Sequence, residues 1–168
     1  MHAPSLVLGI DPGLERTGYA VIDGAARRVV DAGLIRTDVG KPLAARLAEI
    51  EAGLEEVLSE HRVMRVAVED LYAHYAHPRT AILMGHARGV VLLAAARRGL
   101  SVVSLPATQI KKTMTGSGRA SKAQVQRAMM QTLGLARLPE PADVADAMAA
   151  GLCAAMANDE LRMAKRRI

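Results

Sequence analysis

Residues 6–23, "LVLGIDPGLERTGYAVID", contain two apolar runs joined by a Pro-Gly turn, and the first run ends on Asp11. Their composition predicts strands over residues 5–11 and 17–23, and a similar segment over about 28–36 follows the turn sequence "DGAAR". Short connections of this kind favour an antiparallel meander. A partly buried carboxylate is costly unless it is paired or bound to a metal, although an Asp before Pro-Gly can also simply initiate a turn. Asp11 is therefore a candidate functional residue.

The rest of the chain alternates between helical and strand patterns. Apolar residues recur at helical spacing, "VMRVAVED" resembles a parallel strand buried on both faces, and Ser121 with Gln124 has the form of a capping box. The predicted elements are a helix at about 42–60, a strand at 63–70, a helix at about 79–98, a strand at 100–105, a helix whose first residue is Pro106, a helix from Ser121 to about 133, and a helix from near Pro141 to about 157.

Together these elements predict an α/β fold with a mixed five-stranded sheet flanked by helices. No domain boundary is apparent, so we expect one domain over residues 1–168, with a flexible basic tail over about 159–168. Half of the residues are apolar, which is enough for a substantial core. The single cysteine, Cys153, lies in an apolar helical stretch and is expected to be a core residue without a chemical role.

The chain carries 22 Lys and Arg against 17 Asp and Glu, a net charge of +5. A basic surface favours polyanions such as nucleic acids, but this excess by itself is weak support for such a partner. The sequence has no run of apolar residues long enough to span a bilayer and no leader pattern for export. We therefore expect a cytoplasmic protein without a membrane partner.

Four acidic residues share a predicted location. Asp11 and Glu69 end two apolar strands, and sites in open α/β sheets lie at the carboxyl ends of strands. Asp143 and Asp146 are three residues apart at the start of the last helix, so they project from one face. Acids in a first helical turn commonly serve only as dipole partners, and this alternative stays open for the last pair. Four clustered acids would need a divalent cation to remain ionised, and oxygen ligands favour Mg²⁺ or Mn²⁺ over zinc.

The segment "IKKTMTGSGRASK" is the best candidate for binding DNA. Its basic residues surround a glycine loop and a predicted helix N-terminus, both of which suit phosphate contacts: Lys111, Lys112, Arg119 and Lys122. A solvated charged face is an equally good explanation of the spacing alone.

An aromatic residue follows Glu69 closely, in "EDLYAHYAHP". Tyr72 is expected in a loop beside the acids, where its ring could stack on an unpaired base; it could also be an ordinary half-buried tyrosine, and Tyr75 could take the stacking role. His74 and His77 have the spacing of helical metal ligands, but they fall in a predicted loop without Cys, which argues against zinc.

The predicted helix at about 79–98 is apolar nearly all the way round. A helix on the outside of a sheet buries only one stripe, so its second apolar face needs another partner. Two explanations are open: a homodimer interface, or a helix enclosed within the monomer.

Five ordered blocks resemble the RuvC family of Holliday junction resolvases across nearly the whole chain: "LGIDPGLERTGYAVID", "VAVEDLY", "MGHARGV", "IKKTMTGSGRASKAQVQ" and "ADVADAMAAG". The resemblance implies a ribonuclease H-like fold and a homodimer that nicks two strands of like polarity at a four-way junction in recombination and repair. It implies Mg²⁺ dependence, with 5′-phosphate and 3′-hydroxyl ends. Asp11, Glu69, Asp143 and Asp146 match the family's catalytic acids.

The same resemblance places Lys111 and Lys122 at basic positions near the active site and Tyr72 at an aromatic position. Lys122 is accordingly included among the predicted catalytic residues. The resemblance also implies a branch-migration complex of RuvA and RuvB as a partner. Two metal ions per active site would suit the chemistry, because one can activate water while the other stabilises the leaving oxygen.

Three other functions fit parts of the sequence. Sugar kinases and actin-like ATPases open in a similar way, but they close two such domains around ATP, and this chain has room for one. A nuclease acting on RNA would keep the acids without needing a dimer. A DNA-binding module without activity would leave the acids unexplained, because carboxylates near DNA are unfavourable unless a metal neutralises them.

Overall fold

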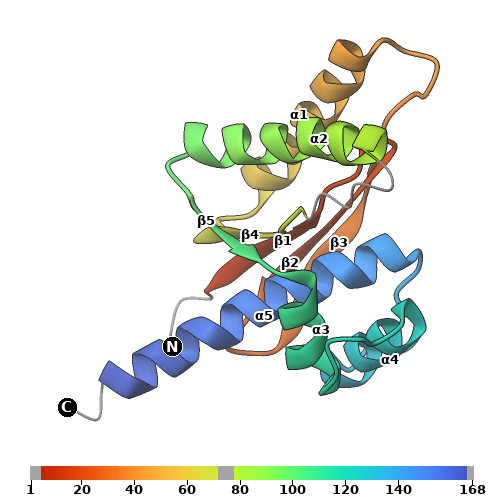
Figure 1. The fold of residues 1–168 in the computed structure, drawn as a ribbon. Coiled ribbons are helices and arrows are strands. Elements are labelled where there is room, and N and C mark those ends of the chain that lie inside the picture. The colour runs from red at the N-terminus through yellow and green to blue at the C-terminus, as the bar shows by residue number, and fades with distance from the viewer. Residues whose placement is uncertain (1–4, 72–77, 166–168) are drawn as a thin grey trace.

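The computed structural model describes residues 5–71 and 78–165, and it forms one mixed sheet covered by helices on both faces (Figure 1). The elements in chain order are β1 (Leu6–Asp11), β2 (Arg16–Asp23), β3 (Arg28–Arg36), α1 (Leu43–Glu60), β4 (Arg65–Glu69), α2 (Pro78–Arg97), β5 (Ser101–Leu105), α3 (Ala107–Thr115), α4 (Lys122–Thr132) and α5 (Ala142–Lys165).

The sheet has five strands in the order β3-β2-β1-β4-β5. Strands β1, β2 and β3 pair antiparallel, which confirms the predicted meander. Strand β4 pairs parallel with both β1 and β5. Helix α1 leads into β4 and helix α2 into β5, and helical crossovers of this kind allow parallel pairing. The predicted mixed five-stranded α/β sheet is therefore confirmed.

Two apolar cores lie on opposite faces of the sheet. Helices α1 and α2 cover one face, and α3, α4 and α5 cover the other (Figure 1). The buried residues of α5 are mostly alanines, and Cys153 lies among them, 3% exposed, as predicted. Small residues let this helix lie close to the strands beneath it.

Glycines in β1 and β2 allow α5 to approach the sheet closely. A Cβ added at Gly9 would lie 2.1 Å from the backbone oxygen of Ala147, and one added at Gly18 would lie 2.1 Å from the backbone oxygen of Asp143. Any larger residue at either position would force the helix away. Because Gly18 pairs with Asp11, this contact also brings the start of α5 to the end of β1.

Two predicted helix boundaries need correction. Pro106 precedes α3 as its N-cap rather than being its first residue, and its carbonyl accepts the N–H of Ile110 at 3.0 Å. Helix α5 runs to Lys165, well beyond the predicted end near residue 157. Leu, Met, Ala and Lys dominate that extension and favour helix, so Asn158 and Asp159 do not end it. The predicted capping box between Ser121 and Gln124 is confirmed.

Helix α2 buries one face and exposes another. Ala87, Val91 and Ala95 lie in the core under α1 and α2, whereas Ile82 is 61% and Leu93 48% exposed. The helix is therefore not enclosed within the monomer, which was one of the two explanations for its apolar composition.

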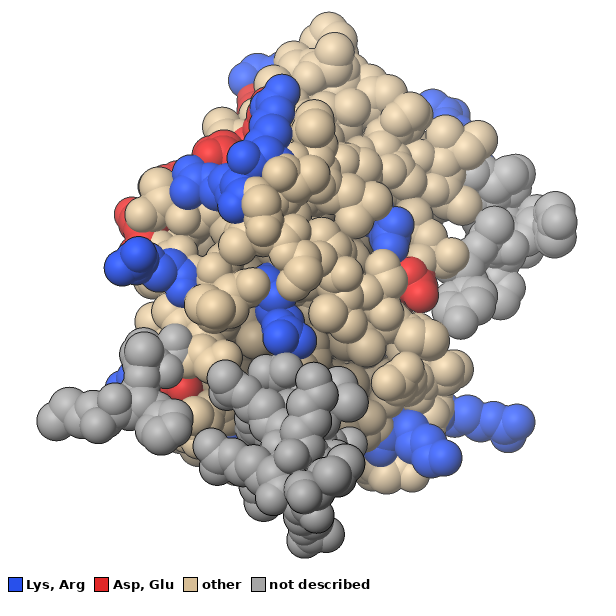
Figure 2. Space-filling model, turned by 90° about the vertical axis from the view of Figure 1, so that its left-hand side faces the viewer, with Lys and Arg blue, Asp and Glu red and all other residues tan. Residues whose placement is uncertain are grey.

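Basic residues are spread over the end of the molecule seen in Figure 2. There, Lys and Arg occur in small groups, several of them beside acidic residues, with broad uncharged areas between them. The excess of positive charge therefore does not form one continuous patch on this face. In the part of the chain that the structure describes, no helix is long and apolar enough to cross a membrane.

Candidate active site

Adjacent parallel strands bring the first two acids together. Ile10 of β1 is paired with Val68 of β4, so the next residues, Asp11 and Glu69, leave the sheet side by side at its carboxyl edge. The apolar runs that precede them are buried, which fixes both strand ends. This is the arrangement that the strand patterns predicted.

The start of α5 supplies the other two acids. Asp143 lies against Gly18, the partner of Asp11 in the sheet, and Asp146 follows one helical turn later on the same face. The close packing of α5 on β1 and β2 thus brings residues more than a hundred positions apart in sequence to one edge of the sheet.

All four acids line one cavity of about 280 Å³. Its wall is formed by residues from seven elements and the turn after β1: Asp11, Pro12, Gly13, Arg16, Glu69, Met84, Lys111, Lys122, Asp143 and Asp146. The predicted basic residues Lys111 and Lys122 are therefore here, whereas Lys112 and Arg119 are exposed on α3 and the following turn, outside the wall.

Burial and the charges of neighbouring acids make Asp11, Glu69 and Asp146 hard to ionise. Burial, and then the charges of Asp146, Glu69 and Asp143, raise the pKa of Asp11 to about 7. Burial is also the main cause that raises the pKa values of Glu69 and Asp146. Lys122 opposes these shifts; its Nζ lies 3.7 Å from Oδ2 of Asp146.

The donor set of this cavity fits a hard divalent cation. Four carboxylates supply only oxygen ligands, which suit Mg²⁺ or Mn²⁺. Burial, and after it the charges of the neighbouring acids, raise the pKa values of Asp11, Glu69 and Asp146 despite the two lysines, and a divalent cation would favour the ionised carboxylates. The residues present therefore fit the metal that the sequence predicted.

The sequence analysis missed two residues of this cavity. Arg16, at the start of β2, places its Nε 3.5 Å from Oδ2 of Asp143, and Met84 reaches the wall from α2. In sequence, Arg16 is one basic residue after a turn and Met84 one apolar residue in an apolar helix. Neither pattern distinguishes these two residues from ordinary surface or core residues, because their place in the cavity wall depends on contacts with residues distant in sequence.

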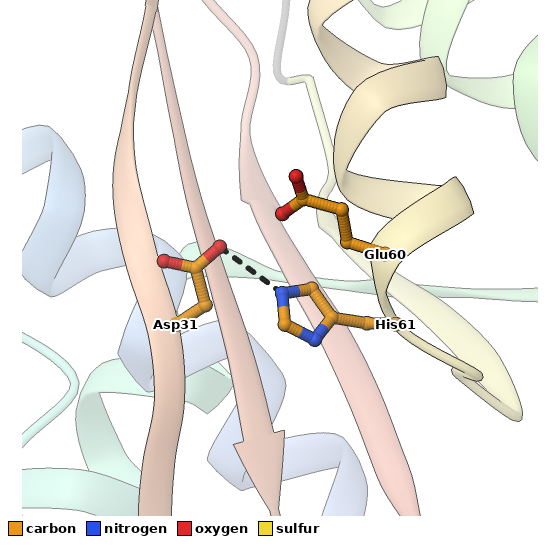
Figure 3. A group of neighbouring side chains, drawn as sticks. All are labelled: Asp31, Glu60 and His61. Carbon is orange, nitrogen blue, oxygen red and sulfur yellow. Dashed lines mark hydrogen bonds and ion pairs between the residues drawn. The ribbon is translucent and has the colours of Figure 1, made fainter.

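A second group of possible metal ligands lies elsewhere (Figure 3). Asp31 of β3 meets Glu60 and His61 at the end of α1, and one ligand atom of each lies within 4.8 Å of the others. Nε2 of His61 is 3.2 Å from Oδ2 of Asp31. The sequence analysis did not identify this group. Among the described residues it is the one group of three or more His, Cys, Asp or Glu residues whose ligand atoms all lie within 4.8 Å of one another, so the acids of the cavity are spaced more widely.

The predictions for Tyr72, Tyr75, His74 and His77 concern residues outside the described part of the chain. They remain predictions. The described residue nearest to them in sequence on the β4 side is Leu71, whose Cδ1 lies 3.9 Å from the position of a Cβ on Gly85 of α2.

Comparisons with known proteins agree on one family. Residues 7–154 match the family described as Crossover junction endodeoxyribonuclease RuvC. The RuvC of Rhodopirellula baltica is 54% identical over 151 residues, covering 89% of this chain and 85% of that protein. The RuvC of Pelotomaculum thermopropionicum is 42% identical over 150 residues, covering 88% and 91%.

Solved structures give the same result. A structure of Thermus thermophilus RuvC in complex with a Holliday junction substrate has a TM-score of 0.82 and 33% identity, covering 93% of this chain and 96% of that chain. The yeast mitochondrial Holliday junction resolvase Ydc2 has a TM-score of 0.57 at 13% identity, which indicates a shared fold only.

Proposed function

This chain belongs to the RuvC family of crossover junction endodeoxyribonucleases, with its ribonuclease H-like fold, and on that premise we propose that its four-acid cavity nicks two strands of like polarity in a four-way DNA junction. The activity is that of a structure-specific hydrolase in homologous recombination and DNA repair. The products would carry 5′-phosphate and 3′-hydroxyl ends, which a ligase can join.

The observation that carries this proposal is the meeting of Asp11, Glu69, Asp143 and Asp146 with Lys111 and Lys122 around one cavity. A DNA-binding surface without activity would not need four partly buried acids, since carboxylates repel phosphates. A cavity that combines oxygen ligands with lysines suits metal-dependent cleavage of a phosphodiester.

We propose that the four acids hold Mg²⁺, with Mn²⁺ as a substitute and two ions per active site. When bound, the ions would lower the pKa of the attacking water and stabilise charge on the leaving oxygen. No protein nucleophile is required. The carboxylates of Asp11, Glu69 and Asp146 must be deprotonated to act as ligands, and their raised pKa values make metal binding and proton release coupled events.

Basic residues of the cavity would receive the scissile phosphate. Lys122 lies beside Asp146, and its mostly exposed side chain can turn toward the DNA backbone; we assign it a catalytic role in stabilising the developing charge. Lys111 would hold the same phosphate or its neighbour. Arg16, paired with Asp143 and half exposed, is a third cation that DNA would meet at this edge.

Contacts with the junction DNA would extend beyond the cavity. Lys112 and Arg119 are exposed on either side of the turn containing Gly116, whose φ of 80° is readily adopted by glycine. Their contacts would be to phosphates and so would not depend on base sequence. Tyr72 is proposed to stack on a base at the centre of the junction.

We further propose that the protein acts as a homodimer through α2. The exposed Ile82 and Leu93 lie on the outer side of this helix, and apart from the adjoining backbone of the helix no atom of the described residues lies within 4 Å of the position of a Cβ on Gly89. A flat apolar stripe with small residues suits packing against a second copy. Two cavities in one dimer would account for two cuts per junction. The cytoplasm is the proposed location, and the RuvA and RuvB branch-migration complex the proposed partner.

The decisive experiment incubates the protein with a labelled four-way junction, a plain duplex and a structured RNA, with and without Mg²⁺. We expect paired nicks in the junction only, in the presence of metal. The Asp146→Asn variant should bind the junction and not cut it. Cleavage of RNA would instead support an RNA nuclease, and junction binding without cleavage by the unaltered protein would support a binding module. A monomer in light scattering at working concentration would contradict the dimer.

A further inference from the structure

Arg88 of α2 contacts the residue that follows Glu69 and connects the ends of two strands. Its Nη2 donates to Oδ1 of Asp70 at 3.2 Å and to Oγ of Ser104 at 2.6 Å. Asp70 directly follows Glu69 at the end of β4, and Ser104 is the penultimate residue of β5. One guanidinium therefore joins β4, β5 and α2 at the edge of the sheet where Glu69 leaves it.

From these contacts we infer that Arg88 is a positioning residue for Glu69. The inference rests on the proposed function, because it concerns how one of the four acids of that site is held. Arg88 does not line the cavity, so it acts through Asp70 rather than on DNA or metal directly.

The backbone around Glu69 depends on this contact. Glu69 pairs with Leu105 in the sheet, and the N–H of Asp70 donates to the carbonyl of Leu105 at 2.9 Å. Beyond that bond the chain leaves the sheet, and the Arg88 guanidinium is the described group that holds the Asp70 side chain. Fixing Asp70 limits rotation of the adjoining peptide, and hence the directions in which Glu69 can point.

The charge of Arg88 acts in the same sense. Asp70 is adjacent to Glu69 in the chain, and the Arg88 guanidinium, whose Nη2 lies 3.2 Å from Oδ1 of Asp70, offsets part of the negative charge of Asp70. Removal of Arg88 would therefore loosen Glu69 and also leave Asp70 to repel it.

Stabilisation of the fold alone is a poorer explanation of this contact. The side chain of Arg88 is only 20% exposed, and its buried Nε finds no hydrogen-bond partner among the described residues. A desolvated donor without an acceptor reduces what the ion pair contributes to stability. The geometry therefore suits fixing the side chain of Asp70 better than stabilising the packing of α2 on the sheet.

The connection also runs toward the proposed dimer interface. Helix α2 carries Arg88, Met84 in the cavity wall, and the exposed Ile82 and Leu93 on its outer side. The same rigid element thus touches the active site and the surface where a second copy would pack.

The test compares Arg88→Gln with Arg97→Gln, an exposed position on the same helix whose guanidinium pairs with Glu51. Single-turnover cleavage of a four-way junction and junction affinity are measured for both, together with Mn²⁺ binding by calorimetry without DNA. We expect Arg88→Gln to slow cleavage and to weaken Mn²⁺ binding by roughly 10–100-fold each, with junction affinity within about twofold of the unaltered protein. Arg97→Gln should change none of these values.

Further variants separate positioning from a general loss of structure. Arg88→Lys, which keeps the charge but not the forked geometry, should recover part of the lost rate, and Arg88→Gln should weaken Mn²⁺ binding no further in a Glu69→Gln background. Equal Mn²⁺ affinity and equal cleavage rates in Arg88→Gln and the unaltered protein would overturn the inference. If the unaltered protein does not cut junctions, the proposed function fails, and the Mn²⁺ measurement still tests the inference about Arg88.

Discussion

Two groups of carboxylates in this molecule look alike by composition and differ in their surroundings. The cavity at the ends of β1 and β4 gathers four partly buried acids with two lysines. The group at the end of α1 gathers Asp31, exposed Glu60 and His61, with the ligand atoms closer together. Close spacing alone would favour the second group as a metal site. Burial, raised pKa values and an all-oxygen donor set favour the first, since these features indicate negative charge that a cation must offset.

The physical difference is how each group satisfies its charge. Asp31 faces the His61 ring and a hydrogen bond from Tyr19, so its carboxylate has partners within the protein. Asp11 is surrounded by three other acids and buried, with Lys122 as the described cation that lowers its pKa. The charge of Asp31 is therefore satisfied without a ligand, whereas the charge of the four acids in the cavity is not.

The largest expected contrast comes from one substitution made in both groups. Glu69→Gln should slow junction cleavage by at least roughly 1,000-fold, because it removes a proposed metal ligand. Glu60→Gln should leave the rate within about twofold of the unaltered protein, because exposed carboxylates contribute little. Gel-based single-turnover cleavage measures both. The reverse outcome would assign the metal centre to the end of α1.

Unfolding free energies at different pH values sharpen the comparison further. The folded pKa of Asp11, about 7, lies above its ordinary value of 3.8, so between these values the folded protein retains a proton that the unfolded chain loses. This destabilisation is absent below pH 4, grows as the pH rises, and is complete above pH 7. Asp11→Asn should therefore stabilise the metal-free protein at pH 8, by up to about 4 kcal/mol, and not at pH 4.

The matched control is Asp31→Asn, measured by chemical denaturation under the same conditions with a chelator present. It should not stabilise the protein at pH 8, because it removes a carboxylate that has hydrogen-bond partners. A gain equal to that of Asp11→Asn would mean that the two groups carry similar uncompensated charge.

A smaller effect is expected from the lysine beside the acids. Lys122→Ala should slow cleavage roughly 10–100-fold, because the variant loses a cation at the developing phosphate charge. Lys41→Ala, which removes an exposed lysine paired with Glu49, should leave the rate unchanged. Junction affinity measured in parallel distinguishes a loss of catalysis from a loss of binding; if only affinity falls, Lys122 is a DNA contact and not a catalytic residue.

The smallest effect is expected at His61. His61→Gln removes the contact with Asp31 and should lower the unfolding free energy by less than about 1 kcal/mol, because the pair is still partly exposed to solvent. Mg²⁺-dependent cleavage should be unaffected. Loss of metal-dependent activity in this variant would show that the group at the end of α1 takes part in catalysis.

Sequence patterns predicted most elements of the fold because each reflects local chemistry. The strand ends at Asp11 and Glu69, the meander and the capping box at Ser121 all follow from short stretches of residues, and the structure agrees. Helix ends were predicted less well: the end of α5 was placed near residue 157, although the residues that follow favour helix.

The site was predictable to the extent that its residues sit at the ends of elements. Strand and helix patterns located all four acids at such ends and predicted a shared location for them, and the resemblance to a family matched them to catalytic acids. Sequence analysis did not identify Arg16 and Met84, because each lies in the cavity wall only through packing against elements distant in sequence. The Asp31 group was missed for the same reason, because Asp31 of β3 and His61 at the end of α1 are brought together only by the fold.

The sequence by itself determined which strands form, where they end, and that two of them end on carboxylates. Apolar runs and the turn residues that bound them are properties of short segments. Only the tertiary structure decided which of the acidic groups is partly buried with more negative charge than the neighbouring cations offset. It did so through the close approach of α5 to Gly9 and Gly18, which brings Asp143 to Asp11. It also decided that Arg88 reaches Asp70 and Ser104. Ionisation depends on the charges and solvent around a group, and these are set by residues far away in the chain.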